Sequence, residues 1–235
     1  MFKLLIAILF LIGLATFFRL PEYKPCTEPI SYSIGAFDRR FDLTQKEFLR
    51  ALAEAESIWE ESINKNLFAY DREQGKLEVN LIYDYRQETT EELNQLERQI
   101  KEEEALYQSM QRELAVMRED PNMNVAEHNA LVERLNALAK EHNKNVEVFN
   151  ALGEARGDTF AGGLYVSDQS GESIDIYEFE NYNKLVRVLA HELGHALGLE
   201  HVEDKEAIMY KLNQGEAGKA SQTDVAALRS LCQIM

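Results

Sequence analysis

The chain has 235 residues, 45% of them hydrophobic, which is typical of a globular protein with one ordinary domain and an appendage. Its 41 acidic and 25 basic residues give a net charge of −16, which argues against a nucleic-acid partner because such a partner requires a basic face. Much of this acidity lies on predicted helical surfaces, where water solvates it.

The N-terminus contains an uncharged apolar run, residues 4–18, flanked by Lys3 and Arg19. The run is shorter than the roughly 20 residues that a helix needs to span a bilayer. It suits the core of a signal peptide or of a short uncleaved signal anchor. We therefore expect residues 1–20 to direct export. The rest of the chain would then be secreted, periplasmic or membrane-anchored, and would touch a membrane only through this segment.

Two strands and a helix are predicted before residue 84. Residues 30–34 alternate between apolar and polar side chains, as a half-buried strand does. A helix begins after Thr44, because Thr44 and Glu47 have the spacing of a capping box. The apolar stripe of this helix includes the single tryptophan, Trp59, which we interpret as a core anchor. Residues 77–83 alternate again and predict a second strand.

A long helical hairpin is predicted next. Apolar residues recur at three- and four-residue spacing from residue 88 to residue 117, and only Glu103 interrupts the series. Residues 119–124 predict a turn, and a second helix with its own apolar face follows. We expect an antiparallel coiled-coil hairpin over residues 88–155, with arms about 45 Å long at a rise of about 1.5 Å per residue.

Two histidines, His128 and His142, lie in this predicted hairpin. Their sequence separation corresponds to about 20 Å along a helix, so they cannot share a metal ion. We interpret them, together with Asn145, as polar side chains that fill the contact between the two helices.

The last third of the chain predicts two more strands and two more helices. Residues 164–166 and 173–177 have the pattern of strands. A helix is predicted over residues 181–199, with apolar residues on its faces. Ser221 then begins a C-terminal helix, and Asp224 occupies the capping-box position.

The first of these two helices carries the pattern H-E-x-x-H-x-x-G-x-x-H. His191 and His195 project from the same helix face and can bind one ion. Gly198 can end the helix in a left-handed conformation, so that the chain turns and brings His201 to the same ion. Three neutral imidazoles with one open coordination position describe a catalytic zinc site. Glu192 lies beside them and can act on a water molecule as a general base.

An amphipathic helix with exposed histidines is the alternative interpretation, but it does not explain the glutamate, the glycine and the third histidine at these offsets. The pattern resembles the metzincin zinc peptidases and, within them, the matrixin family. Met209 follows His201 by eight residues and matches the methionine turn of that clan, whereas by itself it would be an ordinary core residue. Val202 and Lys211 differ from the serine and proline that matrixins usually have.

The resemblance covers approximately residues 30–85 and 159–232. It implies an α+β, zincin-like catalytic domain with a twisted mixed sheet and three main helices, built from residues 21–87 and 156–235. The predicted hairpin, residues 88–155, is not part of the matrixin pattern, so we expect it to be an insertion.

The resemblance also implies an activity, that of a zinc-dependent metalloendopeptidase acting on proteins or peptides. The substrate is expected to lie extended along an edge strand, for which Leu164, Tyr165 and Val166 are the candidates, with Tyr210 at the wall of the pocket. The hairpin is expected to present substrates or to dock a partner. The alternative is a membrane-tethered coiled-coil interaction protein with a vestigial or regulatory metzincin domain, against which the intact Glu192 and its three histidines argue.

Cys26 and Cys232 are the only two cysteines. Matrixins keep the start of the catalytic domain near the C-terminal helix, so the resemblance implies that these two can form a disulfide, which export would permit. Two other interpretations stay open at this point. Cys26 could be a latency thiol that caps the zinc, although its surroundings do not match the latency motif of the family, or both cysteines could be free.

Two kinds of metal are implied by the resemblance. One is a single catalytic zinc, and the other is structural calcium. Oxygen ligands for calcium could come from Asp158, Asp168, Glu172 and Asp175. Acidic residues in loops are otherwise simply solvated.

Overall fold

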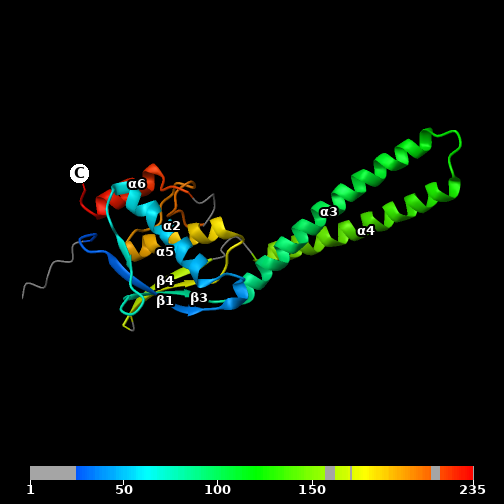
Figure 1. Ribbon diagram of the computed structural model, residues 1–235. Coiled ribbons are helices and arrows are strands. Elements are labelled where there is room, and N and C mark those ends of the chain that lie inside the picture. Colours follow the sequence, from blue (N-terminus) through cyan, green and yellow to red (C-terminus); the bar gives the residue numbers. More distant parts are fainter. Residues whose placement is uncertain (1–24, 157–161, 170, 213–217, 235) are drawn as a thin grey trace, which may run out of the picture.

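The computed structural model describes residues 25–156, 162–169, 171–212 and 218–234. It contains a mixed five-stranded sheet in the order β2-β1-β3-β5-β4 (Figure 1). The strands are β1 (Ile30–Phe37), β2 (Phe68–Tyr70), β3 (Leu77–Leu81), β4 (Gly163–Asp168) and β5 (Gly171–Ile176). The helices are α2 (Gln45–Ile63), α3 (Tyr85–Glu119), α4 (Val125–Arg156), α5 (Tyr182–Leu197) and α6 (Gln222–Leu231), with a short 3-10 helix over Arg39–Phe41.

The sheet is parallel except at one edge, where β4 runs antiparallel to β5. Along β3 the alternate residues Leu77, Val79 and Leu81 are buried, as the sequence pattern predicts. Helices α2, α5 and α6 lie together on one side of the sheet (Figure 1), and α5 contacts both β4 and β5. The mixed fold expected from the sequence is therefore confirmed.

Helix α2 begins and packs as its sequence predicts. Thr44 and Glu47 form the complete capping box. Trp59 is fully buried, and its indole Nε1 donates a hydrogen bond to the carbonyl oxygen of Ala190 at 2.7 Å. This bond connects α2 directly to α5, so the predicted core anchor also fixes the helix that carries two of the histidines.

Strand β2 was not predicted, because three residues are too few to show alternation. It pairs in parallel with β1, and Ile30 is opposite Phe68. The Glu60 carboxylate accepts hydrogen bonds from the N–H groups of Leu67 and Phe68 at 2.8 and 3.0 Å. A side chain of α2 therefore binds the chain at the start of this strand.

Helices α3 and α4 lie side by side and antiparallel, and they project away from the sheet (Figure 1). They occupy the part of the chain in which two helices were predicted, although α3 begins at Tyr85 rather than at residue 88. With 35 residues, α3 is about 52 Å long. The division of the chain into a domain and an insertion stays a prediction.

Glu103 does not simply interrupt the contact between α3 and α4, because it is buried there. Its Oε1 atom accepts hydrogen bonds from Asn145 Nδ2 at 2.7 Å and from Gln99 Nε2 at 3.2 Å. Its Oε2 atom lies 3.6 Å from Nδ1 of His142. The polar residues at these positions thus form one layer between the helices, and a buried carboxylate needs such partners.

The first turns of α3 pack against the segment that leads into α5. The hydroxyl of Thr90 donates to Oε1 of Glu178 at 2.9 Å, and both residues are buried. The N–H of Phe179 donates to Oε1 of Gln87 at 3.0 Å. The base of the two-helix projection is therefore attached to the domain by two polar contacts of α3, one buried and one partly buried.

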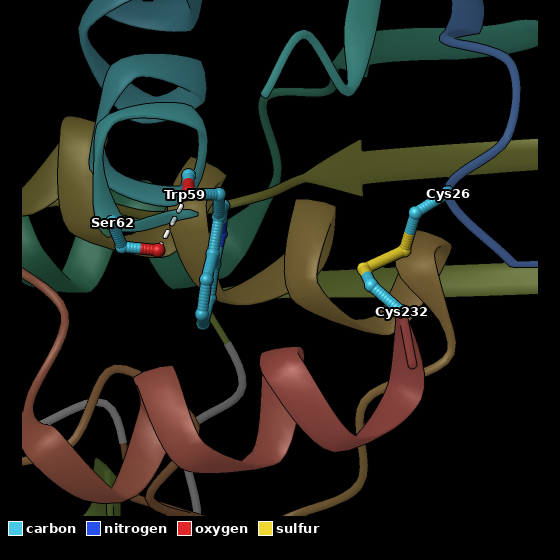
Figure 2. Close-up of a disulfide and its surroundings, with 4 residues drawn as sticks. All are labelled: Cys26, Trp59, Ser62 and Cys232. Atoms are coloured by element: carbon cyan, nitrogen blue, oxygen red, sulfur yellow. Dashed lines mark hydrogen bonds between the residues drawn. A yellow bond between two sulfur atoms is a disulfide. The ribbon is translucent and has the colours of Figure 1, made fainter. Parts of the chain in front are cut away.

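A disulfide joins Cys26, just before β1, to Cys232, which caps the end of α6 (Figure 2). The two cysteines are 206 residues apart in the sequence. In the same region, the hydroxyl of Ser62 donates to the carbonyl oxygen of Trp59 at 2.6 Å. Because Cys26 has no free thiol, the interpretation of this residue as a latency thiol does not apply.

Within the described part of the chain, no helix combines the length and the apolar character that crossing a membrane requires. The predicted export segment, residues 1–20, lies outside the described residues.

Candidate metal centre

Three histidines converge at the C-terminal end of α5. His191 and His195 lie on α5, which ends at Gly198 in a left-handed conformation with φ of 100°. The turn at Gly198 returns the chain so that His201 faces the other two. Nε2 of His201 lies 3.2 Å from Nε2 of His195 and 3.3 Å from Nε2 of His191. The structure thus brings together the three histidines that the sequence pattern singled out.

These distances fit a tetrahedral zinc ion. Two nitrogen ligands, each about 2.0–2.1 Å from a zinc, are about 3.3 Å apart at the tetrahedral angle. Among the residues that the structure describes, this is the one group of three or more His, Cys, Asp or Glu side chains that could hold a metal ion.

In His191 and His195, the hydrogen bond made by Nδ1 leaves Nε2 able to bind a cation. Nδ1 of His191 lies 2.7 Å from the carbonyl oxygen of Ile208, and Nδ1 of His195 lies 2.9 Å from that of Leu199. Carbonyl oxygens only accept hydrogen bonds, so each Nδ1 carries the proton and each Nε2 presents its lone pair. Burial lowers the pKa of His191 to about 4 and also lowers the pKa of His195. Both rings are therefore neutral at neutral pH, as metal ligands must be.

Glu192, on α5 next to His191, is buried and lies against the start of β4. Burial raises the pKa of its carboxyl group to about 7, and a hydrogen bond from the backbone of Tyr165 opposes this shift. A cation held by the three histidines would add a positive charge nearby and favour the ionised form. The side chain is therefore placed to accept a proton without being one of the three converging ligands.

The residues predicted to contact a substrate lie on β4 and directly after Met209. Strand β4 forms the edge of the sheet, and Leu164 on it is 48% exposed, so its side chain is available to a ligand. Tyr165 and Val166 are half-buried. Tyr210 is buried and directly follows Met209, so its ring is not freely presented at the surface.

The segment around Met209 contacts the first histidine, because the carbonyl oxygen of Ile208 lies 2.7 Å from Nδ1 of His191. The N–H of Val202 donates to the carbonyl oxygen of Met209 at 2.9 Å, and Met209 is fully buried. The carboxylate of Asp224 accepts hydrogen bonds from the N–H groups of Ile208 and Met209 at 2.8 and 3.0 Å.

Sequence reasoning assigned Asp224 only to the cap of α6, a role that it also has. It also gave no role to Arg187 on α5, which donates to the carbonyl oxygen of Ala207 at 2.7 Å. A charged residue between two valines on a buried helix was the available signal for Arg187. No sequence signal indicated that Asp224 would contact a segment fifteen residues earlier.

The predicted calcium ligands do not gather into a site among the described residues. Both carboxylate oxygens of Asp175 have partners, since Oδ1 accepts from Asn80 at 2.8 Å and Oδ2 accepts from Tyr177 at 3.1 Å. Asp158 lies outside the described residues. Structural calcium therefore receives no support.

The sequence profile of the matrixin family matches residues 24–233, which includes α3 and α4. A comparison with the curated proteins finds no match. The family implies zinc, which agrees with the spacing of the three Nε2 atoms. The profile matches most of the chain, and so this protein belongs to the matrixin family.

Proposed function

We propose that this matrixin is an exported zinc endopeptidase whose general base is Glu192. The observation that carries the proposal is the set of three Nε2 atoms at the spacing of zinc ligands, with a buried carboxylate beside them. Membership of the family supports a zinc metallopeptidase acting on proteins or peptides.

The three histidines and Glu192 have different roles in the proposed reaction. Zinc bound by His191, His195 and His201 would supply an acidified water at neutral pH and polarise the substrate carbonyl. Glu192 accepts the proton of the attacking water and then delivers it to the leaving amine. The backbone of Tyr165 holds the carboxyl group of Glu192 through a hydrogen bond, which limits the orientations that it can adopt.

Strand β4 is the surface on which we place the substrate. Among the described residues it has a neighbouring strand on one side only, so an extended peptide could pair with its other edge, apart from the Tyr165 backbone group that already bonds to Glu192. The same strand contacts α5. A peptide added to this edge would therefore extend the sheet as a further strand and lie close to Glu192.

Export is supported by two features. The apolar run at residues 4–18 has the composition of a signal sequence or signal anchor. The disulfide between Cys26 and Cys232 suits an oxidising compartment, because such bonds are rare in the cytosol.

We assign the distal part of α3 and α4 to substrate selection or partner docking, without a part in bond cleavage. Its attachment through Gln87 and Thr90 supports a fixed direction relative to the domain. Near its far end, Val116 and Val125 are exposed, and apolar side chains of this kind are available for contact.

The decisive experiment compares wild type with Glu192→Ala in the digestion of a peptide library. Wild type should cleave peptides and reveal a side-chain preference. The variant should keep about one zinc per chain but lose nearly all activity, because the carboxylate is a base and not a ligand.

Two outcomes would contradict this assignment. One is a variant with near-normal turnover, and the other is a folded variant that has lost its zinc. The alternative is an interaction protein with a vestigial peptidase domain. It would be favoured if the wild type cleaves no peptide and if Glu192→Ala restores the cellular defect of a deletion strain as well as wild type does.

A further inference from the structure

Arg187 is a buried arginine on α5, only 1% exposed and one helical turn before His191. Removing a guanidinium group from water is costly unless it is paired and hydrogen-bonded, and an apolar side chain of similar volume can replace a buried charge without loss of stability. Stability alone therefore does not account for an arginine at this position.

Arg187 and Asp224 hold the two ends of a single peptide group. Nη2 of Arg187 donates to the carbonyl oxygen of Ala207 at 2.7 Å. The N–H of the same peptide group, which belongs to Ile208, donates to Oδ2 of Asp224 at 2.8 Å. A positive and a negative side chain thus bind opposite ends of the peptide dipole, and both interactions are buried.

The next peptide group contacts the metal ligand. The carbonyl oxygen of Ile208 accepts the hydrogen bond from Nδ1 of His191 at 2.7 Å, and the N–H of Met209 donates to Asp224 at 3.0 Å. Peptide groups are planar, and only the two dihedral angles of Ile208 separate these two planes. Holding the Ala207–Ile208 peptide therefore limits the directions in which the Ile208 carbonyl can point.

The charges around Arg187 fit this arrangement. Burial lowers the pKa of its guanidinium group, and the negative charges of Asp224 and Glu206 raise it. An arginine remains protonated in such surroundings. The positive charge is therefore retained next to the segment that it holds.

We propose that Arg187 is a positioning residue for the metal ligand His191, acting through the Ala207–Ile208 peptide group. The inference rests on the proposed zinc peptidase function and extends it to the support of the ligand. A partner that orients a metal-binding histidine commonly changes metal affinity by about 10- to 100-fold when it is removed. Removing the Arg187 side chain should therefore weaken zinc binding.

The test replaces Arg187 by methionine, which has a similar length but neither charge nor donor. Zinc affinity is measured by competition with a chromogenic chelator, and the dissociation constant should rise about 10- to 100-fold. Tyr32→Phe is the control, because it removes a partly buried hydrogen bond to Glu56 from β1, which contributes no metal ligand. This control should unfold at a lower temperature yet keep its zinc dissociation constant within about twofold of wild type.

Equal affinities of wild type and Arg187→Met would overturn the proposal, and so would a loss of affinity in Tyr32→Phe as large as that in Arg187→Met. If Arg187→Met does not fold, Arg187→Lys carries the test, since it keeps the charge beside Asp224 but loses the guanidinium geometry. Weaker zinc binding by folded Arg187→Lys supports the role, and unchanged binding overturns it. A wild type that binds zinc but cleaves no peptide would contradict the peptidase function and leave this comparison of affinities intact.

Discussion

Gly163 and Glu192 are so close that no side chain fits between them. A Cβ atom at Gly163 would lie 2.7 Å from Cγ of Glu192 and 2.9 Å from its Oε1 atom. The same atom would lie 2.9 Å from a methyl carbon of Val188. The glycine at the start of β4 therefore provides the space in which the proposed base lies.

Gly163→Ala should consequently displace the carboxylate of Glu192 while leaving the three histidines in place. We expect the variant to bind about one zinc per chain and its kcat on a short peptide to fall about a hundredfold, the cost of a misplacement near 1 Å. Kinetic assays and metal analysis measure both quantities. Gly153→Ala is the control, because a Cβ there meets nothing within 4 Å and α4 is a helix that favours alanine. Wild-type kcat in Gly163→Ala would contradict this account of the site.

The disulfide should contribute strongly to the stability of the domain. On the chain-entropy model, a bond that closes a loop of this length stabilises the folded state by about 5 kcal/mol. Denaturant unfolding of wild type and of a Cys26→Ser, Cys232→Ser double variant should differ by approximately that amount. Adding a reductant should destabilise wild type and leave the double variant unchanged. Equal stability of wild type and the double variant without reductant would show that the disulfide does not stabilise the domain.

Thr89 and Thr90 provide a matched pair for testing the attachment of α3. The Thr90 hydroxyl donates to buried Glu178, whereas that of Thr89 donates at 2.8 Å to the carbonyl oxygen of Tyr85 in its own helix. Thr90→Val should therefore lower the free energy of unfolding by about 1–3 kcal/mol, the usual cost of removing one partner of a buried polar group. Thr89→Val should change it by less than about 0.5 kcal/mol. Chemical denaturation of both variants measures these free energies. Equal losses of stability in Thr89→Val and Thr90→Val would contradict a specific role for Thr90.

The far half of the two-helix projection should be dispensable for chemistry. Replacing residues 108–139 by a short Gly-Ser turn keeps the polar layer at Glu103 and the attachment at Thr90. Hydrolysis of a short peptide should stay within about tenfold of wild type, a barrier change of about 1.4 kcal/mol. Cleavage of protein substrates, found by comparing digests by wild type and Glu192→Ala, should fall much further. A folded, zinc-loaded deletion that loses both activities equally would contradict the docking role.

The sequence alone was sufficient for the histidine cluster and for the ends of several helices. His191, His195 and His201 lie within eleven residues, so helical geometry and one left-handed glycine largely determine their arrangement. The caps at Thr44 and Ser221 are equally local, since each side chain bonds a residue three positions later.

Only the tertiary structure decided which groups support this cluster. Ile208 contacts His191, Asp224 contacts Ile208, and Arg187 contacts Ala207, each across 16 to 20 residues of sequence. No periodic pattern encodes such contacts, because they depend on how α5, α6 and the segment around Met209 pack together. The position of Glu103 is a similar case, since the sequence marks it only as a polar residue in an apolar series. Its burial is possible because the antiparallel pairing brings Asn145 and His142 within reach, and an unpaired buried carboxylate would be too costly.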